Sequence, residues 1–349
     1  DMKRIYIYVI TAFALLAGAC SDNNLNDDAP VVPATPDIVI PEGAAEGELL
    51  IKFVPEMTEI LDRTMKTRAA GASTRSGIPS TDEVLSILGA YDFERVFPVD
   101  SRTEEKSREA GLHLWYLVRF DKNTDLKEAM ERLSGLGEIS KLQINPAIQR
   151  AYNPKKKPVP VSEAALNRMR TRAAADNGFK FNDALLPHQW GYINRGAYDF
   201  ATENAPAIVG SDVNCEEAWE LCTGDPEIIV AVLDEGVMYT HEDLTANMWV
   251  NEKEQVGSDQ DNDGNGYKGD RYGYNFVKDN GNISWQAAED TGHGTHVAGT
   301  IAAVNGNNKG VCGIAGGDGT KKGVRIMSCQ VFDGDGQVRM VNEARAIKY

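Results

Sequence analysis

The chain has 349 residues, of which 42% are hydrophobic, so it is long and apolar enough for two or three domains with real cores. It carries 36 basic residues against 52 acidic ones, a formal net charge of −16. This acidic balance favours solubility and argues against nucleic acid or an anionic membrane surface as a partner.

The N-terminus has the pattern of an export signal. Lys3 and Arg4 form a positive region before an apolar run at 5–16, which is too short for a membrane span. The run ends in Leu-Ala-Gly-Ala-Cys, which resembles a bacterial lipobox, where a signal peptidase cuts before the cysteine. We therefore predict a lipoprotein signal peptide at 1–19 and a lipidated Cys20 that anchors the exported protein in the cell envelope, at the outer membrane or the cell surface. The alternative is an ordinary cleaved signal with an incidental cysteine.

Two segments lack the apolar residues that a core requires. Residues 20–46 are rich in Asp, Asn, Pro and Ala, which predicts a flexible tether. Residues 153–184 hold several prolines, lysines and arginines, and no aromatic residues lie among the basic residues that cluster at 155–172. A nucleic-acid-binding patch is the alternative for this second segment, but the acidic chain favours a solvated linker that is open to proteases.

Between these segments, residues 47–152 alternate between strand and helix patterns. A loop is predicted at 64–77, followed by a capping box at Ser80–Glu83 that would start a helix. The segment Asn123-Thr124-Asp125 would cap a second helix, whose apolar residues recur at i, i+3, i+4 and i+7. The predicted strands are 48–54, 93–99, 112–120 and 139–148. The order β-α-β-β-α-β predicts a ferredoxin-like α+β unit.

Downstream, a continuous apolar run at Ile228–Leu233 ends in Asp234-Glu235-Gly236. Such a run is typical of a buried parallel strand, and functional groups in doubly wound sheets lie just past the ends of such strands. We therefore expect the carboxylate of Asp234 at the tip of a strand.

A histidine lies between two glycines in the segment Asp-Thr-Gly-His-Gly-Thr-His at 290–296, directly before an apolar run that predicts a helix. Flanking glycines let a substrate come close, because they carry no Cβ. A general base needs an imidazole within reach of both a nucleophile and a carboxylate. Asp234 followed by His293 is two thirds of a hydrolase triad. His296 lacks the spacing and the glutamate of a metalloprotease helix, so we expect it to be structural.

The two segments that hold this pair resemble a known family. Val-Ala-Val-Leu-Asp-Glu-Gly at 230–236 resembles the aspartate motif of subtilisin-like serine peptidases, and His-Gly-Thr-His-Val-Ala-Gly-Thr-Ile-Ala-Ala resembles their histidine motif. The resemblance implies a subtilisin-like doubly wound parallel sheet, of the α/β class, at 185–349. It implies that Asp234 orients and stabilises the imidazolium and that His293 is the general base and then the acid. Glu235 departs from the small hydroxyl residue that is usual after the aspartate.

The resemblance also gives residues 47–152 a role. In position, size and order of elements they are similar to the propeptide of subtilisin-like peptidases, which is a folding chaperone and an intramolecular inhibitor. Such a propeptide places its C-terminal tail in the active-site cleft, and that tail would lie near 145–152. The alternative is an unrelated α+β domain.

A nucleophilic serine is missing from the expected place. In the subtilisin order it comes last, in a glycine-rich turn that opens a later helix. Ser328 is the only serine after His293, and it lies within 324–331, a predicted buried strand. We therefore expect that the chain is a fragment that stops before the serine and lacks activity itself, while the intact enzyme hydrolyses protein or peptide substrates. The alternative is a non-enzymatic lipoprotein that keeps the scaffold as a binding or inhibitory module.

An acidic loop between the two triad residues has the spacing of a calcium loop. Oxygen ligands occupy its positions 1, 3 and 5, a glycine is at 6 and a carboxylate at 12. We predict structural calcium, and the alternative is a solvated loop rich in Asp and Gly. The predicted ligands are Asp259, Asp261, Asp263, Asn265, Tyr267 and Asp270. Asn265 would bind through its side chain or its backbone carbonyl, and Tyr267 through its backbone carbonyl or a water molecule.

A second calcium site is implied only by resemblance. His241–Leu244 resembles a segment whose aspartate binds calcium in many subtilisin-like peptidases, which points to Asp243. The loop at 304–311 resembles the partner loop and points to Asn307.

The cysteines have simple structural explanations. Cys215 and Cys222 are about two helical turns apart, roughly 10 Å, which is too far for a disulfide. Cys329, in a predicted buried strand, is most simply an apolar core residue. A disulfide between Cys312 and Cys329 is the open alternative in an oxidising compartment.

Overall fold

The computed structural model describes residues 38–67, 75–151, 162, 164, 178–196, 207–286, 290–333 and 337–349. The predicted signal peptide, Cys20 and most of the tether and linker lie outside these ranges. The described ends of both segments are structured, contrary to prediction: residues 44–46 belong to a strand, and Phe181 is buried with Leu186 and Trp219. No described helix combines the length and the apolarity needed to cross a membrane.

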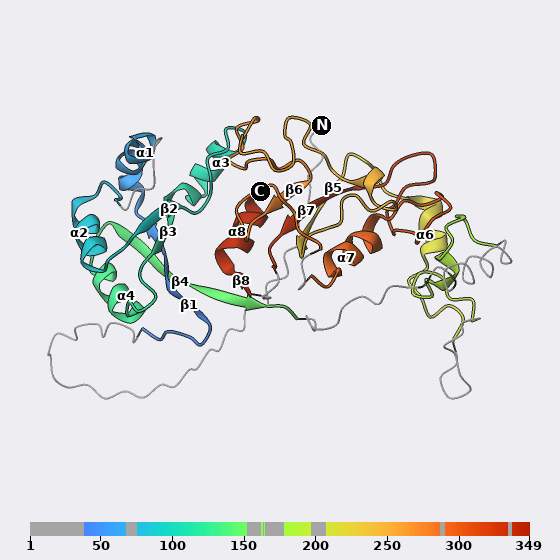
Figure 1. Ribbon diagram of the computed structural model, residues 1–349, viewed down its shortest axis with the longest axis horizontal. Coiled ribbons are helices and arrows are strands. Elements are labelled where there is room, and N and C mark those ends of the chain that lie inside the picture. The colour runs from blue at the N-terminus through green and yellow to red at the C-terminus, as the bar shows by residue number, and fades with distance from the viewer. Residues whose placement is uncertain are drawn as a thin grey trace, which may run out of the picture. The chain divides into compact units, whose positions relative to one another are not determined.

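Residues 44–151, the N-terminal domain, form an antiparallel sheet with helices packed on it (Figure 1). The strand order is β2-β3-β1-β4, which is the order of a ferredoxin-like fold and confirms the predicted fold class. Its strands are Ala44–Phe53 (β1), Asp92–Arg95 (β2), Trp115–Arg119 (β3) and Ile139–Gln149 (β4). Its helices are Thr58–Thr67 (α1), Pro79–Ile87 (α2), Glu104–Glu109 (α3) and Leu126–Ser134 (α4), with short 3₁₀ turns at Pro55–Met57 (η1) and Leu112–Leu114 (η2).

One apolar core joins the sheet of this domain to its helices. Phe53 of β1 meets Tyr116 of β3 edge to face at 5.6 Å between ring centroids. Tyr116 also stacks on Phe93 of β2 at 4.6 Å. Helix α4 contributes Ala129 and Leu133, which are fully buried in the same cluster. The period-two and helical patterns in the sequence arise from this shared core.

The helix starts match the sequence in one case and differ in the other. Asp125 caps α4 as predicted, because its side chain accepts hydrogen bonds from the backbone N–H groups of Lys127 and Glu128. The predicted capping box at Ser80–Glu83 is wrong. Helix α2 begins earlier, at Pro79, whose ring fixes a helical φ in the first turn.

Other boundaries of the N-terminal domain also differ from prediction: the strand expected at 93–99 ends at Arg95, the strand expected from 48 begins at Ala44, and two further differences involve helical turns. The strand expected at 112–120 begins at Trp115, since the three residues before it form the 3₁₀ turn η2. The loop expected at 64–77 is shortened, because α1 continues to Thr67. At 112–114 and at 64–67, helical turns replace the strand and the loop that the sequence predicts.

Residues 178–349, the C-terminal region, contain a parallel sheet in the order β5-β7-β6. This confirms the predicted α/β class and the parallel strand that ends at Asp234. The strands are Ile229–Asp234 (β5), Gly273–Asn275 (β6), Arg325–Gln330 (β7) and Gln337–Arg339 (β8). The helices are Cys215–Leu221 (α6), His293–Ala302 (α7) and Met340–Lys348 (α8), with 3₁₀ turns at Leu186–His188 (η3) and Thr245–Asn247 (η4). Helix α7 packs on β5 and β7 through Ala298 and Ala302, against Val232 and Ile326.

Strand β8 is not part of the parallel sheet and instead joins the sheet of the N-terminal domain. It pairs antiparallel with β4, with Ile148 opposite Val338 and Ala147 opposite Arg339 (Figure 1). Helix α8 follows at once and packs Val341 into a cluster with Leu50 and Leu117. The N-terminal domain and the C-terminal region therefore both contribute strands to one five-stranded sheet. Residues 38–349 belong to one compact unit.

The cysteines of the described chain are all free. Cys329 is buried in an apolar cluster, as the sequence predicts. Cys312 is also buried and its thiol donates to Asp183 at 3.2 Å, so the disulfide left open between Cys312 and Cys329 is not formed.

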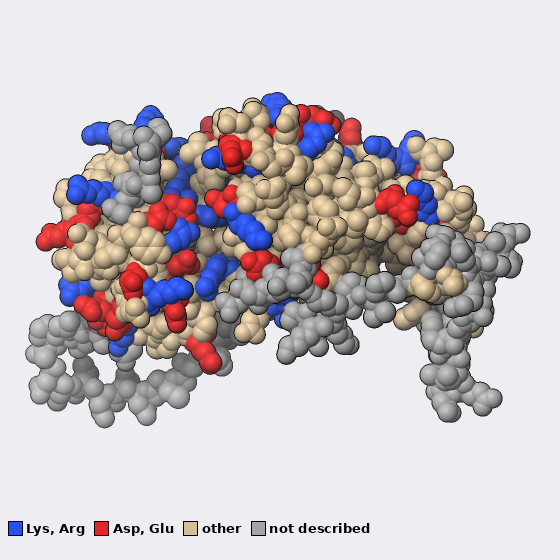
Figure 2. All heavy atoms as spheres, viewed as in Figure 1, with Lys and Arg blue, Asp and Glu red and all other residues tan. Residues whose placement is uncertain are grey.

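Charged residues of both signs are interspersed on the face seen in Figure 2. Among the described residues visible there, Lys and Arg do not form one continuous stripe.

Candidate active site

The site is built from the end of β5 and the start of α7. Asp234 is the last residue of β5, which pairs in parallel with β7. Its Oδ1 accepts a hydrogen bond from the backbone N–H of Glu235 at 2.6 Å. The carboxylate is thereby held in one orientation at the tip of the strand.

Two glycines let α7 begin against this strand end. Gly292 caps the helix with φ of +77°, a left-handed conformation that favours glycine. At Gly294 a Cβ would collide with the carbonyl oxygen of Glu235. Glycine at this position therefore allows the close approach that places His293, the first residue of α7, beside Asp234.

His293 and Asp234 are in direct contact. Nδ1 of His293 lies 2.7 Å from Oδ2 of Asp234, and the imidazole side chain is 35% exposed. Because a carboxylate only accepts, Nδ1 carries the proton, and the lone pair of the neutral ring is on Nε2. This is the tautomer in which a histidine can remove a proton from a nucleophile.

Ser328 lies in β7 and is fully buried. Its Oγ accepts a hydrogen bond from the backbone N–H of Val237 at 3.2 Å. It is part of the sheet's packing, as its predicted strand position implies, and not a nucleophile presented to solvent.

Glu235 has a role that the sequence did not indicate. Its side chain is 1% exposed, and its Oε2 accepts from the backbone N–H of Thr291 at 2.9 Å. The Thr291 hydroxyl lies 3.0 Å from each of its oxygens. The only signal in the sequence was that Glu235 replaces the small hydroxyl residue usual in the resembling family.

Arg150 brings the N-terminal domain to this site. It follows β4 directly, within the predicted tail at 145–152, and its Nη1 forms an ion pair with Glu235. Its Nη2 donates to the carbonyl oxygen of Asp333, and its guanidinium carbon lies 5.5 Å from the centroid of the Phe332 ring.

Two of the six predicted calcium ligands come together. Asp263 and Asp270 join Glu254 in a group whose ligand oxygens all lie within 4.8 Å of one another. Burial raises the pKa of Asp270, and the neighbouring carboxylates of Asp263 and Glu254 add to this effect. Glu254 was missed because it precedes the loop and lies outside its ligand spacing.

The other predicted ligands of this loop are not part of this carboxylate group, although Asn265 borders it. The carboxylate of Asp261 accepts from the backbone N–H groups of residues 264, 265 and 266, so it stabilises the turn. Asp259 is exposed, and Asn265 donates to Asp270 at 2.7 Å. Tyr267 is buried with its side chain in an aromatic cluster.

Asp243 and Asn307 lie together. Nδ2 of Asn307 donates to Oδ1 of Asp243 at 2.7 Å, and the backbone N–H of Val311 donates to Oδ2 at 3.0 Å. Asp183, which the sequence did not single out, accepts from the backbone N–H of Gly306 at 2.6 Å. Burial raises the pKa of both Asp243 and Asp183.

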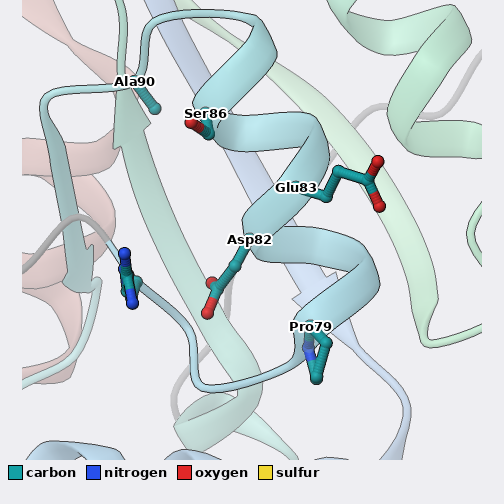
Figure 3. Close-up of a pocket in the computed structure, with 6 residues that line it drawn as sticks. Pro79, Asp82, Glu83, Ser86 and Ala90 are labelled. Atoms are coloured by element: carbon teal, nitrogen blue, oxygen red, sulfur yellow. The ribbon is translucent and has the colours of Figure 1, made fainter.

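A separate pocket of about 420 Å³ lies beside α2 in the N-terminal domain (Figure 3). Its lining comes from Arg75, Pro79, Asp82, Glu83, Ser86 and Ala90. The Asp82 carboxylate accepts from the backbone N–H of Ser76 at 2.6 Å, so it is committed to the start of the helix. The lining includes neither Asp234 nor His293, and this pocket is not part of the site.

Comparison with known proteins gives a family for this region. Residues 225–349 match the model of the subtilase family. Subtilisin-like protease 1 of Plasmodium vivax is 33% identical over 193 residues, which cover 54% of this chain and 26% of that protein. An extracellular protease of Xanthomonas campestris is 36% identical over 142 residues, which cover 39% of this chain and 21% of that protein.

Among solved structures, the serine protease of Aeromonas sobria in complex with its chaperone is 24% identical, with a TM-score of 0.30. The match covers 50% of this chain and 24% of that one, and so distant a likeness adds nothing to the assignment. The chain spans about a quarter of the length of the curated relatives it matches. Residues 225–349, which hold Asp234 and His293 in hydrogen-bond contact, are thus the part of the chain that matches the subtilase family model.

Proposed function

We propose that the intact protein is an exported serine endopeptidase precursor whose triad includes Asp234 and His293. The observation that carries this proposal is the 2.7 Å contact between Nδ1 of His293 and Oδ2 of Asp234, within the segment that matches the subtilase family. A serine from outside residues 1–349 would complete the triad. The substrates would be protein or peptide chains.

The reaction would proceed through an acyl-enzyme. His293 Nε2 takes the serine hydroxyl proton as the oxygen attacks the peptide carbonyl carbon, and then gives that proton to the leaving amine. Water attacks the acyl group in the second half, with His293 again as the base. Asp234 keeps the ring in the required tautomer and stabilises the imidazolium.

The N-terminal domain would act as an intramolecular inhibitor and folding partner. Its last strand pairs with β8, and Arg150 directly after this strand reaches the residue next to Asp234. A chain that occupies this place would block a substrate from it. Removal of the domain by cleavage in the linker would then release activity.

Catalysis tests the proposal directly. In the full-length protein, Asp234→Asn should lower kcat by about 10⁴-fold, because the neutral amide favours the wrong tautomer of His293. His293→Ala should be at least as inactive, and both variants should accumulate unprocessed precursor if maturation is autocatalytic. Normal casein hydrolysis and processing by Asp234→Asn would contradict the proposal.

The chain of residues 1–349 by itself should not hydrolyse casein, because His293 has no serine to activate. Steady proteolysis by this purified chain that His293→Ala abolishes would overturn the assignment of the nucleophile. The second candidate function is a non-enzymatic binding or inhibitory lipoprotein. Full-length protein that binds peptides but never cleaves them would favour it.

We also propose structural calcium. Glu254 and Asp270 are buried, and burying carboxylates close together is costly unless a cation neutralises them. Glu254, Asp263 and Asp270 supply the oxygen ligands that calcium prefers, and Asp243 with Asn307 would supply a second set. Calcium would stabilise the folded C-terminal region and take no part in peptide cleavage.

Export with a lipid at Cys20 completes the proposal. It is supported by the signal pattern at 1–19, and an extracellular protease is among the relatives of this chain. Labelled palmitate should be incorporated into the full-length protein in a bacterial host and not into its Cys20→Ser variant. Equal labelling of both proteins would contradict lipidation at this residue.

A further inference from the structure

Arg150 and Glu235 form a buried ion pair beside the candidate catalytic dyad. Each side chain is only 1% exposed, although they are 85 positions apart and belong to different parts of the chain. Glu235 adjoins Asp234, so two carboxylates lie on consecutive residues at the end of β5. Thr291 gives Glu235 neutral donors, whereas Arg150 gives it a positive charge.

The surroundings of Arg150 match a guanidinium group in particular. Nη1 faces the Glu235 carboxylate, while Nη2 faces the carbonyl oxygen of Asp333. The Phe332 ring lies near the guanidinium carbon, at 5.5 Å. A planar, forked cation can meet two acceptors and an aromatic ring together, which the compact ammonium of lysine does less well.

Loss of Arg150 would be costly because the carboxylate of Glu235 is buried. A carboxylate that is 1% exposed and loses its cationic partner keeps its desolvation penalty, which makes loss of one partner of a buried pair strongly destabilising. If cleavage removes the N-terminal domain, Arg150 leaves with it. Another cation that enters the same place would then be bound favourably.

We propose that Glu235, the carbonyl of Asp333 and the ring of Phe332 form an arginine-recognition subsite. Arg150 fills this subsite in the precursor, and an arginine side chain of the substrate fills it in the mature enzyme. The substrate arginine takes the place of Arg150, one residue after the strand that pairs with β8. The proposal rests on the proposed endopeptidase function and names its substrate class. The competing explanation is that the ion pair only clamps the two parts of the precursor together.

The first experiment tests the subsite without catalysis. In full-length precursor that carries His293→Ala to prevent self-processing, Arg150→Ala should open a guanidinium-sized space. Ethylguanidinium at millimolar concentration should then raise the melting temperature, and its neutral analogue ethylurea should not. Adding Glu235→Gln to Arg150→Ala should abolish the rise. An equal effect of ethylguanidinium on protein that retains Arg150 and on the two variants would show that no such subsite exists.

The second experiment tests substrate choice in the mature enzyme. Matched peptides would carry arginine, lysine or citrulline at the position of Arg150, citrulline being the neutral isostere of arginine. The kcat/KM should be roughly 10- to 100-fold higher for arginine than for citrulline, as expected for a hydrogen bond between charged groups. Lysine should lie between them.

Glu235→Gln should bring the arginine peptide down to the level of the citrulline peptide. Glu217→Gln, which removes an exposed carboxylate of α6, should leave the preference intact. Equal kcat/KM for arginine and citrulline would reduce the ion pair to a clamp and overturn the subsite. Failure to cleave any peptide would contradict the endopeptidase function instead, and the melting experiment would still decide whether the subsite binds guanidinium.

Discussion

Consecutive acidic residues at the end of β5 have different partners and different consequences. Asp234 turns to His293, whereas Glu235 turns to Thr291 and Arg150. The first contact could be predicted from the sequence, because the motif residues and their order match a triad. The second could not, because nothing local to Glu235 or Arg150 indicates that they meet across 85 positions.

Gly294 offers a test of how tightly α7 must approach the strand. Gly294→Ala should destabilise the full-length protein and lower its activity, because the new Cβ would collide with the Glu235 carbonyl oxygen. Gly299→Ala in the same helix is the matched control, since its Cβ would meet nothing within 4 Å. This control should be neutral or stabilise by up to about 1 kcal/mol. Chemical denaturation would compare them, and equal stability of the two variants would refute the close approach.

His113 should make the stability of the N-terminal domain depend on pH. Burial lowers the pKa of His113 below 6.5, and the positive charges of Arg108 and Arg95 lower it further. The unfolded chain therefore binds a proton more readily, so this contribution is complete above the unfolded pKa and is lost as the pH falls through the lowered folded pKa.

His113→Gln can keep a hydrogen bond to Thr58, which lies 3.1 Å from Nε2, but it cannot titrate. Denaturation of full-length precursor at pH 7 and pH 5 should show a smaller loss of stability on acidification for this variant. If the parent and the variant lose the same amount, His113 does not cause the dependence.

At the scale of elements, the sequence predicted the start of a helix best where a single residue sets that start. Asp125 caps α4 because its short carboxylate reaches two backbone N–H groups, and that depends only on neighbours in the chain. The start of α2 depends on more. Ser80 and Thr81 turn their hydroxyls to Glu138, a partner from the turn before β4, so they do not serve as the helix cap.

The cap of α4 gives a quantitative expectation. Asp125→Ala should destabilise the N-terminal domain by about 1 kcal/mol, because two backbone N–H groups lose their acceptor. Lys122→Ala, at an exposed position just before the same helix, should change stability by no more than about 0.5 kcal/mol. Urea unfolding of full-length precursor would measure both, and indistinguishable midpoints would argue against the cap.

At the scale of the whole molecule, sequence patterns predicted the ferredoxin-like and parallel sheets because both repeat a simple periodicity. They did not predict that β8 leaves the C-terminal region to extend the N-terminal sheet. Three residues carry no recognisable strand pattern, and the pairing depends on an edge that β4 offers from a distant part of the chain.

Calcium should stabilise the full-length protein as a whole. A ligand that binds only the folded state adds about 2.7 kcal/mol at a hundredfold excess over Kd, so the melting temperature should be higher in calcium than in chelator. Asp263→Asn should remove part of this difference. Asp243→Asn tests the second ligand set independently, and Asp261→Asn should destabilise the loop in either condition because it holds backbone amides.

For calcium at the acidic loop, the decisive comparison is how much calcium raises the melting temperature of the parent and of Asp263→Asn. The melting would be measured with His293→Ala present to prevent self-digestion. If calcium raises the melting temperature equally in the parent and in Asp263→Asn, the loop is a solvated acidic insertion.

The pairing of β8 with β4 has a consequence for the order of events during synthesis. A three-residue strand is not stable alone, so β8 takes its conformation from an edge that already exists. The cost of closing a loop grows only with the logarithm of its length, so a partner roughly 190 residues earlier is within reach. That partner is made first, because domains fold from the N-terminus during synthesis. The edge of β8 would therefore be covered by β4 as soon as it forms, and it would stay covered until cleavage removes the N-terminal domain.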